Sequence, residues 1–272
     1  MTQTATQAPA QRTWKIVIAY DGSDFRGWQV QPGLPTIQGE LQSALDRIVG
    51  EAPLPQGSGR TDAGVHAVGQ VASFALNAPI PPGNLLRALN RTLPPSIRVL
   101  DAAVVPDAFH ARHDAVAKAY EYRLMPGAAD RCPPFQARYV YACPWTLNRA
   151  ALDAAAARFV GEHDFRSFAA SDPDQATRQA DDEGPRSTVR EIFSSSWEER
   201  LTAEGLLLVY RVRGNGFLHH MVRNLVGTMV EIGRGFWSDD SIPAILAACN
   251  RSAAGPTAPA RGLFLHSVEY GG

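Results

Sequence analysis

The sequence predicts an α+β protein in which a mixed, mainly antiparallel sheet is flanked by helices. Segments with the periodicities of strands and helices alternate along the 272 residues and suggest two related halves. Few of the strand pairs are joined by short hairpins, which favours a mixed or antiparallel sheet with helices beside it. A chain of this length can form one large or two modest domains with a substantial core.

The first half, residues 13–109, follows a tail at residues 1–12 that is rich in Thr, Gln, Ala and Pro. This tail has no apolar stretch, so we expect it to be disordered and not a signal peptide. Thr36 is expected to cap the first helix and Gly50 to end it. The expected strands are 14–20, 68–76 and 97–105, and the expected helices are 37–48 and 84–91.

The second half, residues 110–272, repeats the alternation. Thr146 is expected to cap its first helix and Gly161 to end it. Residues 171–185 are polar, acidic and rich in turn formers, which predicts a mobile loop or insertion. The expected strands are 117–125, 188–196, 206–213 and 264–270, and the expected helices are 147–160, 216–233 and 241–249.

Composition is that of a folded protein, with 45% hydrophobic and 19% charged residues. No apolar run is long enough to span a bilayer, so a cytoplasmic location is the expectation and no membrane partner is expected. Cys132, Cys143 and Cys249 lack the paired spacing of a zinc site and are expected to be free, reduced thiols. We expect neither a metal nor a cofactor, because no metal-ligand cluster and no glycine-rich phosphate loop with a lysine is recognisable.

The formal net charge of −1 neither supports nor excludes a nucleic-acid partner. Phosphate binding depends on a local basic face, not on the charge of the whole chain. Lys15 and Lys118 are the only lysines, so nearly all positive residues are arginines. Arginine suits bidentate phosphate contacts, but a compositional bias explains the same count.

The glycine-rich stretch Gly57–Ala67 contains the first candidate for chemistry, Asp62. Its glycines let the backbone turn sharply and approach a ligand closely, which predicts a tight loop before a strand. Arg60 lies two residues before Asp62, so both side chains point the same way in an extended stretch. A neighbouring cation keeps a carboxylate ionised, as a nucleophile or base requires. Equally, Asp62 could merely brace the turn through its own backbone.

Arg223 is the second candidate, in the helix expected after Asn215. It lies on a different face from the apolar stripe and one turn before Gly227, beside which another backbone or a ligand could approach. The alternative is a solvated arginine on an outer helix face. His219 and His220, as neighbours on a helix, would point about 100° apart and could not bind one metal together. The stripe comprises Leu218, Met221, Val222, Leu225 and Met229.

Tyr120 is the third candidate, in the expected strand around residues 118–123. In a strand it shares one face with Tyr122, while Glu121 and Arg123 take the other. Aromatic and cationic groups together can stack on a base and hold a phosphate. The alternative is that the two tyrosines pack within an ordinary sheet.

Taken together and in order, these motifs resemble the tRNA pseudouridine synthase A family. The stretch from Gly59 to Ala67 is a highly specific match, and the other segments are moderately specific. The matching segments are Tyr20–Gln29, Gly59–Ala67, Phe109–Arg112, Lys118–Arg123, Arg186–Arg190, Asn215–Gly227 and Gly262–Leu265.

The resemblance implies an isomerase that converts uridine to pseudouridine. Asp62 would be the catalytic aspartate, Arg223 its ion-pair partner and Tyr120 the residue stacked on the target base. Arg60 would help displace the uridine from its stack, because chemistry on a base requires its extrusion. The uracil leaves C1′, turns and rejoins through C5, which requires no cofactor. Whether Asp62 attacks the sugar, attacks the ring or abstracts a proton is left open.

The resemblance also implies the fold and the partner. Two related α/β-sandwich domains would share the sheet, with a basic cleft between them, and a homodimer would bind tRNA. The target uridines would lie in the anticodon stem-loop, at tRNA positions 38, 39 and 40. The chain departs from the family pattern at His113–Asp114 and in the acidic stretch 172–183, which affects substrate contacts and not the chemistry.

Two other functions are compatible with the residues alone. One is a tRNA-binding or RNA-folding module without catalysis, which the arginine-rich loops and paired tyrosines would serve. The weaker one is a carboxylate-dependent hydrolase of a nucleoside bond, which would release free uracil.

Overall fold

The computed structural model describes residues 11–171 and 187–271, which group into two compact units. Unit 1 comprises Met1–Ala115 with Leu265–Gly272, and unit 2 comprises Val116–Phe264. The chain therefore returns to unit 1 at its C-terminal end. The predicted division into residues 13–109 and 110–272 did not include this return. The predicted tail falls outside the described residues except for its last two, and Arg12 already begins a strand. The predicted insertion falls outside them apart from Ser171.

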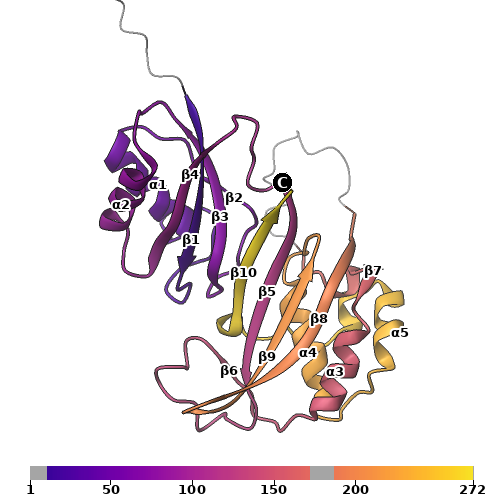
Figure 1. Ribbon diagram of the computed structural model, residues 1–272. Coiled ribbons are helices and arrows are strands. Elements are labelled where there is room, and N and C mark those ends of the chain that lie inside the picture. The colour runs from indigo at the N-terminus through magenta and orange to yellow at the C-terminus, as the bar shows by residue number, and fades with distance from the viewer. Residues whose placement is uncertain (1–10, 172–186, 272) are drawn as a thin grey trace, which may run out of the picture. The chain divides into compact units, whose positions relative to one another are not determined.

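In unit 1, β1 pairs antiparallel with both β3 and β4, and two helices lie on one side of these strands (Figure 1). Its strands follow the order β4-β1-β3-β10, and β2 pairs with β3. Thr36 caps α1 by accepting a hydrogen bond from the Gly39 backbone at 3.3 Å, and Gly50 ends the helix with a φ of 87°, as predicted. The elements are β1 Arg12–Tyr20, α1 Ile37–Val49, β2 Gln56–Gly57, β3 His66–Leu76, α2 Pro82–Thr92, β4 Ile97–Val105 and β10 Leu263–Tyr270.

Unit 2 contains the strand order β5-β9-β8-β7, in which neighbours are antiparallel, while β6 runs parallel to β5. The predicted α+β class with a mixed, mainly antiparallel sheet is thus confirmed. The strands are β5 Ala115–Met125, β6 Tyr141–Ala142, β7 Gly161–Asp164, β8 Val189–Thr202 and β9 Gly205–Gly214. The helices are α3 Arg149–Ala157, α4 Met221–Gly233 and α5 Ser241–Ala248, with short 3-10 turns η1 Arg166–Phe168, η3 Arg251–Ala253 and η4 Ala260–Gly262.

Two predicted helix starts are wrong. Asn148, not Thr146, caps α3, because its side-chain oxygen accepts a hydrogen bond from the Ala151 backbone at 3.1 Å. The helix expected from residue 216 begins only at Met221, because His220 adopts a left-handed φ of 59° that cannot continue a right-handed helix. Leu218, placed in the apolar stripe, consequently lies before the helix.

Every helix in the described residues is too short or too polar to cross a membrane. The three cysteines are free, as predicted.

The strands β5 and β9 divide their side chains between two faces, as the alternation predicted. Tyr122 lies opposite Tyr210, and both side chains are fully buried. On the other face Glu121 lies opposite Arg211. The two strands therefore contribute aromatic rings to the core on one side and charged groups on the other.

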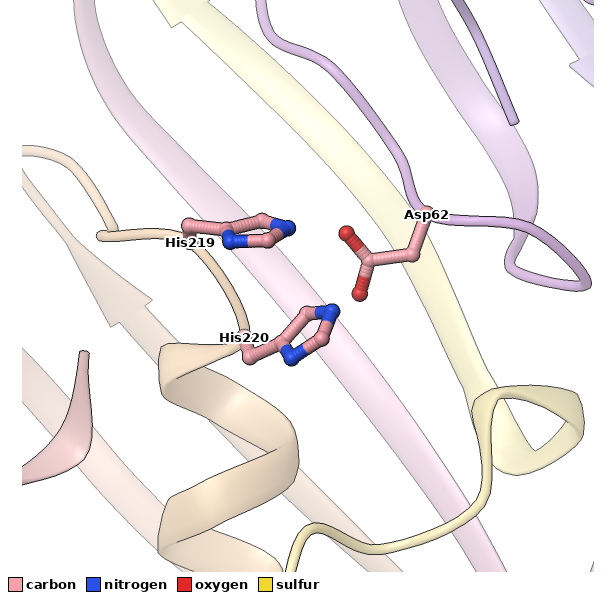
Figure 2. Close-up of side chains that lie close together, drawn as sticks. All are labelled: Asp62, His219 and His220. Atoms are coloured by element: carbon pink, nitrogen blue, oxygen red, sulfur yellow. The ribbon is translucent and has the colours of Figure 1, made fainter. Parts of the chain in front are cut away.

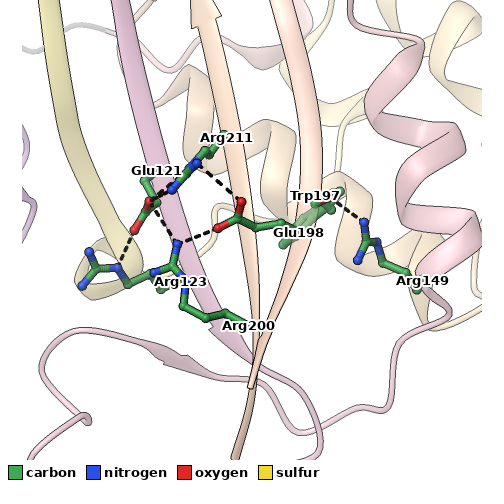
Figure 3. A network of polar contacts seen from close by, with 7 residues as sticks. All are labelled: Glu121, Arg123, Arg149, Trp197, Glu198, Arg200 and Arg211. Carbon is green, nitrogen blue, oxygen red and sulfur yellow. Dashed lines mark hydrogen bonds and ion pairs between the residues drawn. The ribbon is translucent and has the colours of Figure 1, made fainter. Parts of the chain in front are cut away.

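Glu121 is the centre of an ion-pair network on this charged face (Figure 3). Its side chain is only 3% exposed, and its carboxylate lies 2.7 Å from Arg123, 3.2 Å from Arg211 and 3.9 Å from Arg200. Glu198 pairs with two of these arginines, 2.6 Å from Arg200 and 3.4 Å from Arg211. Burial raises the pKa of Glu121, but the hydrogen bonds and positive charge of the arginines outweigh burial and lower it below its ordinary value of 4.5. Arg123, one of the cationic groups near Tyr120 in the sequence, is thus paired within the protein.

Glu121→Gln is expected to lower the free energy of unfolding at pH 7, because it leaves three arginines beside a neutral amide. A carboxylate with a lowered folded pKa stabilises the protein above its unfolded pKa and loses this contribution as the pH falls through the folded value. The difference from wild type should therefore shrink as the pH falls below about 4.5. Urea unfolding of both proteins between pH 7 and pH 3 measures this difference in the free energy of unfolding. The control is Glu198→Gln. The Glu198 side chain is 40% exposed, so its loss should lower the free energy of unfolding less. An equal loss in both variants, or one independent of pH, would contradict the prediction.

Candidate active site

Asp62 opens a tight turn in the loop between β2 and β3 of unit 1. The Val65 backbone N–H donates to the Asp62 carbonyl at 3.1 Å, and Gly64 has a φ of 77°, which favours glycine at the third position of such a turn. The half-buried side chain projects from the loop in Figure 2. The predicted loop before a strand is confirmed, with the strand beginning at His66.

Arg60 and Asp62 flank a residue that points inward. Thr61 is only 7% exposed, whereas Arg60 is exposed and Asp62 is half-buried. This alternation agrees with the expectation that the two charged side chains point the same way. Arg60 and Asp62 are thus both more exposed than the residue between them.

The segment from Tyr20 to Trp28 holds this loop through its backbone. Trp28 N–H donates to the Thr61 carbonyl at 3.0 Å, and Gly64 N–H donates to the Phe25 carbonyl at 3.4 Å. Gly27 has a φ of 93°, and a Cβ there would lie 2.6 Å from the Thr61 carbonyl oxygen. The two stretches thus approach more closely than any side chain at position 27 would permit.

Two further contacts complete the support of the loop. A Cβ on Gly22 would overlap the Val65 carbonyl oxygen, so this approach also requires glycine. Gln70 donates to the Gly59 carbonyl at 2.8 Å and accepts from the Ser58 hydroxyl at 2.6 Å. In the sequence, residues 20–29 indicated a family resemblance and no role in holding the loop. Their two internal glycines were the signal that backbone had to pack closely there.

Tyr120 lies on β5 in unit 2, two residues before the fully buried Tyr122. It is 9% exposed, and its ring meets Phe217 edge to face at 5.0 Å. Tyr122 is fully buried and donates its hydroxyl to the Pro259 carbonyl at 2.8 Å, and burial raises its pKa well above the ordinary value. The two tyrosines predicted as a pair therefore differ, because Tyr122 belongs to the core and Tyr120 lies at its margin.

Arg223 is anchored in unit 2 by a backbone segment that crosses α4. Its Nε donates to the Ala258 carbonyl at 2.8 Å, and the Ala258 N–H donates to the Arg223 carbonyl at 3.1 Å. A Cβ on Gly227 would overlap the Pro256 carbonyl oxygen. The expected close approach beside Gly227 is confirmed, and the approaching group is the protein's own backbone. The alternative of a solvated outer arginine is wrong.

Asn224 ties the same crossing segment to the helix from the inside. Its buried side chain accepts from Arg251 at 3.0 Å and from Thr257 at 2.6 Å, and donates to the Phe168 carbonyl at 2.7 Å. Thr228 accepts from the Gly255 backbone at 2.9 Å. These contacts join segments far apart in the sequence, so no local pattern indicated them.

His219 and His220 lie before α4 and not on it, which corrects the expectation of divergent side chains. The left-handed backbone of His220 brings the two rings side by side, with centroids 4.0 Å apart (Figure 2). Nδ1 of His219 lies 3.0 Å from the Ser171 carbonyl oxygen. Helical geometry therefore does not prevent His219 and His220 from facing one metal ion.

Comparison with known proteins gives one consistent result. The sequence model of a family described as tRNA pseudouridine synthase matches residues 16–114 and 155–271. A tRNA pseudouridine synthase A of Solibacter usitatus is 52% identical over 95% of this chain and its own full length. Its counterparts in Moorella thermoacetica and Bacillus pumilus are 46% and 42% identical over 94% of this chain and 98% of theirs.

Proposed function

Since the chain belongs to the tRNA pseudouridine synthase family, we propose that Asp62 carries out the isomerisation of uridine to pseudouridine in tRNA. The protein is an isomerase acting on tRNA uridines, and a purely RNA-binding role is not favoured. The observation that supports Asp62 is its place at the start of a turn whose backbone is held from two sides. A carboxylate held in this way has the fixed position that a catalytic group needs.

The isomerisation rearranges bonds without oxidation or reduction. The bond from C1′ to N1 of the uracil breaks, the detached ring turns, and a bond forms from C1′ to C5. C5 loses its proton, and N1 gains one. An ionised carboxylate can serve as nucleophile or as base in such a sequence, so Asp62 suits each of the three routes.

We further propose roles for the other three predicted residues. Arg60, exposed beside Asp62, displaces the uridine from its stack. Tyr120 stacks on the target base, and the 9% of the residue that stays exposed at the margin of the core supports this role. Arg223 is the ion-pair partner of Asp62, and its anchored Nε supports a fixed guanidinium.

The choice of uridines is a finer proposal. We propose that they lie in the anticodon stem-loop, at the positions expected from the family resemblance. A homodimer, a basic cleft and a cytoplasmic location remain predictions from the sequence.

Incubation of the protein with unmodified tRNA tests the function. We expect pseudouridine at a small set of anticodon stem-loop positions, with label released to water from tRNA carrying tritium at uridine C5, because C5 loses its proton. Binding without modification would indicate an RNA-binding module. Free uracil among the products would indicate a hydrolase.

A further inference from the structure

We infer that Tyr20 is a positioning residue for the reaction, acting on Asp62 through a hydrogen bond to Thr61. The inference rests on the proposed catalytic role of Asp62. Tyr20 ends β1, and its hydroxyl lies 2.8 Å from the Thr61 hydroxyl, a contact between residues 41 positions apart. Thr61 is the residue immediately before Asp62. The position of Thr61 therefore determines the position of the Asp62 Cα, from which the carboxylate extends.

Burial makes this hydrogen bond consequential. Tyr20 is 4% exposed and Thr61 is 7% exposed, so water cannot easily replace either partner. A buried polar group that loses its partner keeps the cost of its desolvation. Removing the Tyr20 hydroxyl therefore favours rotation or displacement of Thr61 toward another partner.

Thr61 is held by two different kinds of contact. Its carbonyl accepts from the Trp28 backbone at 3.0 Å and lies against Gly27, while its side chain is held by Tyr20. The backbone contact fixes the peptide on one side, and the hydroxyl pair fixes the residue on the other. A side-chain substitution can remove the second contact and leave the first in place.

The bond persists over the working pH range. Burial raises the pKa of Tyr20 to about 12, so the hydroxyl stays protonated near neutral pH. A phenylalanine at this position then removes one hydroxyl group and no charge. Any change in rate reflects geometry, because the charge near Asp62 is unaltered.

The experiment compares kcat and KM for tRNA in Tyr20→Phe, Thr61→Val and Thr61→Ser. We expect Tyr20→Phe and Thr61→Val each to lower kcat about tenfold or more with KM within about twofold, because displacement of a catalytic group by about 1 Å costs up to about a hundredfold. Thr61→Ser keeps the hydroxyl and should restore most of the rate. The double variant Tyr20→Phe/Thr61→Val should be no slower than the slower single variant, since Tyr20→Phe already removes the bond to Thr61 together with its contact to Gln70.

Tyr210→Phe is the matched control. Tyr210 is also a buried tyrosine, and its hydroxyl lies 2.8 Å from the Ser195 hydroxyl in unit 2. Both tyrosine variants should lose stability, but only Tyr20→Phe should lose kcat when each is assayed below its unfolding temperature. If Tyr20→Phe does not fold, the kcat of Thr61→Val compared with that of Thr61→Ser tests the inference.

An unchanged kcat in Tyr20→Phe, or in Thr61→Val where Tyr20→Phe does not fold, would overturn the inference. An equal fall of kcat in Tyr20→Phe and Tyr210→Phe would also overturn it, since it would reflect a general loss of stability and not the position of Asp62. Additive losses in the double variant would also contradict it. Failure of the proposed function is distinct, because wild type would then form no pseudouridine or Asp62→Asn would remain active.

Discussion

Asp62→Asn and Asp62→Ala are expected to lower pseudouridine formation by at least about a hundredfold, the lower range for loss of a group that transfers a proton. The loss follows because neither side chain supplies an ionised oxygen. The turn itself is closed by backbone groups, from Val65 N–H to the Asp62 carbonyl. Both variants should therefore fold and bind tRNA. Pseudouridine mapping after a fixed incubation, with binding measured by fluorescence anisotropy, checks the two expectations separately.

Asp101→Asn is the control for this experiment. Asp101 is an exposed carboxylate on β4 in the same unit, so its loss changes the net charge equally without altering the loop. It should retain the wild-type rate. Turnover within tenfold of wild type in Asp62→Asn would remove Asp62 from the chemistry.

Gly227→Ala is expected to lower the free energy of unfolding by at least about 2 kcal/mol, within the range for overpacking a filled site. Helix propensity alone predicts the opposite, a gain of up to about 1 kcal/mol. The steric term should win because the added methyl group would overlap the carbonyl oxygen of Pro256, which is backbone and cannot rotate away. Urea unfolding measures the change. Displacement of Pro256 also moves Ala258, so the rate should fall with it because Ala258 anchors Arg223.

Gly83→Ala is the matched control, because Gly83 lies in α2 and nothing stands within 4 Å of its added Cβ. This variant should be as stable as wild type or more stable. A loss of stability in Gly227→Ala without one in Gly83→Ala would establish that contact with Pro256, not helix propensity, decides the outcome. Wild-type stability in Gly227→Ala would refute the steric argument.

Local patterns predicted those elements whose ends are set by neighbouring residues. The helix α1 is capped by Thr36 and ended by Gly50 through contacts within a few positions, so both ends were predictable. The start of α4 was not, because the left-handed backbone of His220 is an uncommon conformation that the residue type does not announce. The division of Tyr122 and Glu121 between two faces followed from the two-residue period of a strand.

Residue types and their spacing made Asp62 a candidate for chemistry, with a role in bracing the turn equally open. The candidate was a carboxylate among glycines with Arg60 two positions before it, and the family resemblance supplied both its proposed catalytic role and the reaction. The support of that group could not be read in this way. Tyr20 reaches Thr61 across 41 positions, and Gly227 admits Pro256 from a segment beyond the end of its helix. Such contacts depend on where the chain returns in three dimensions, and the folded arrangement alone determines which hydroxyl or carbonyl group meets the loop or the helix.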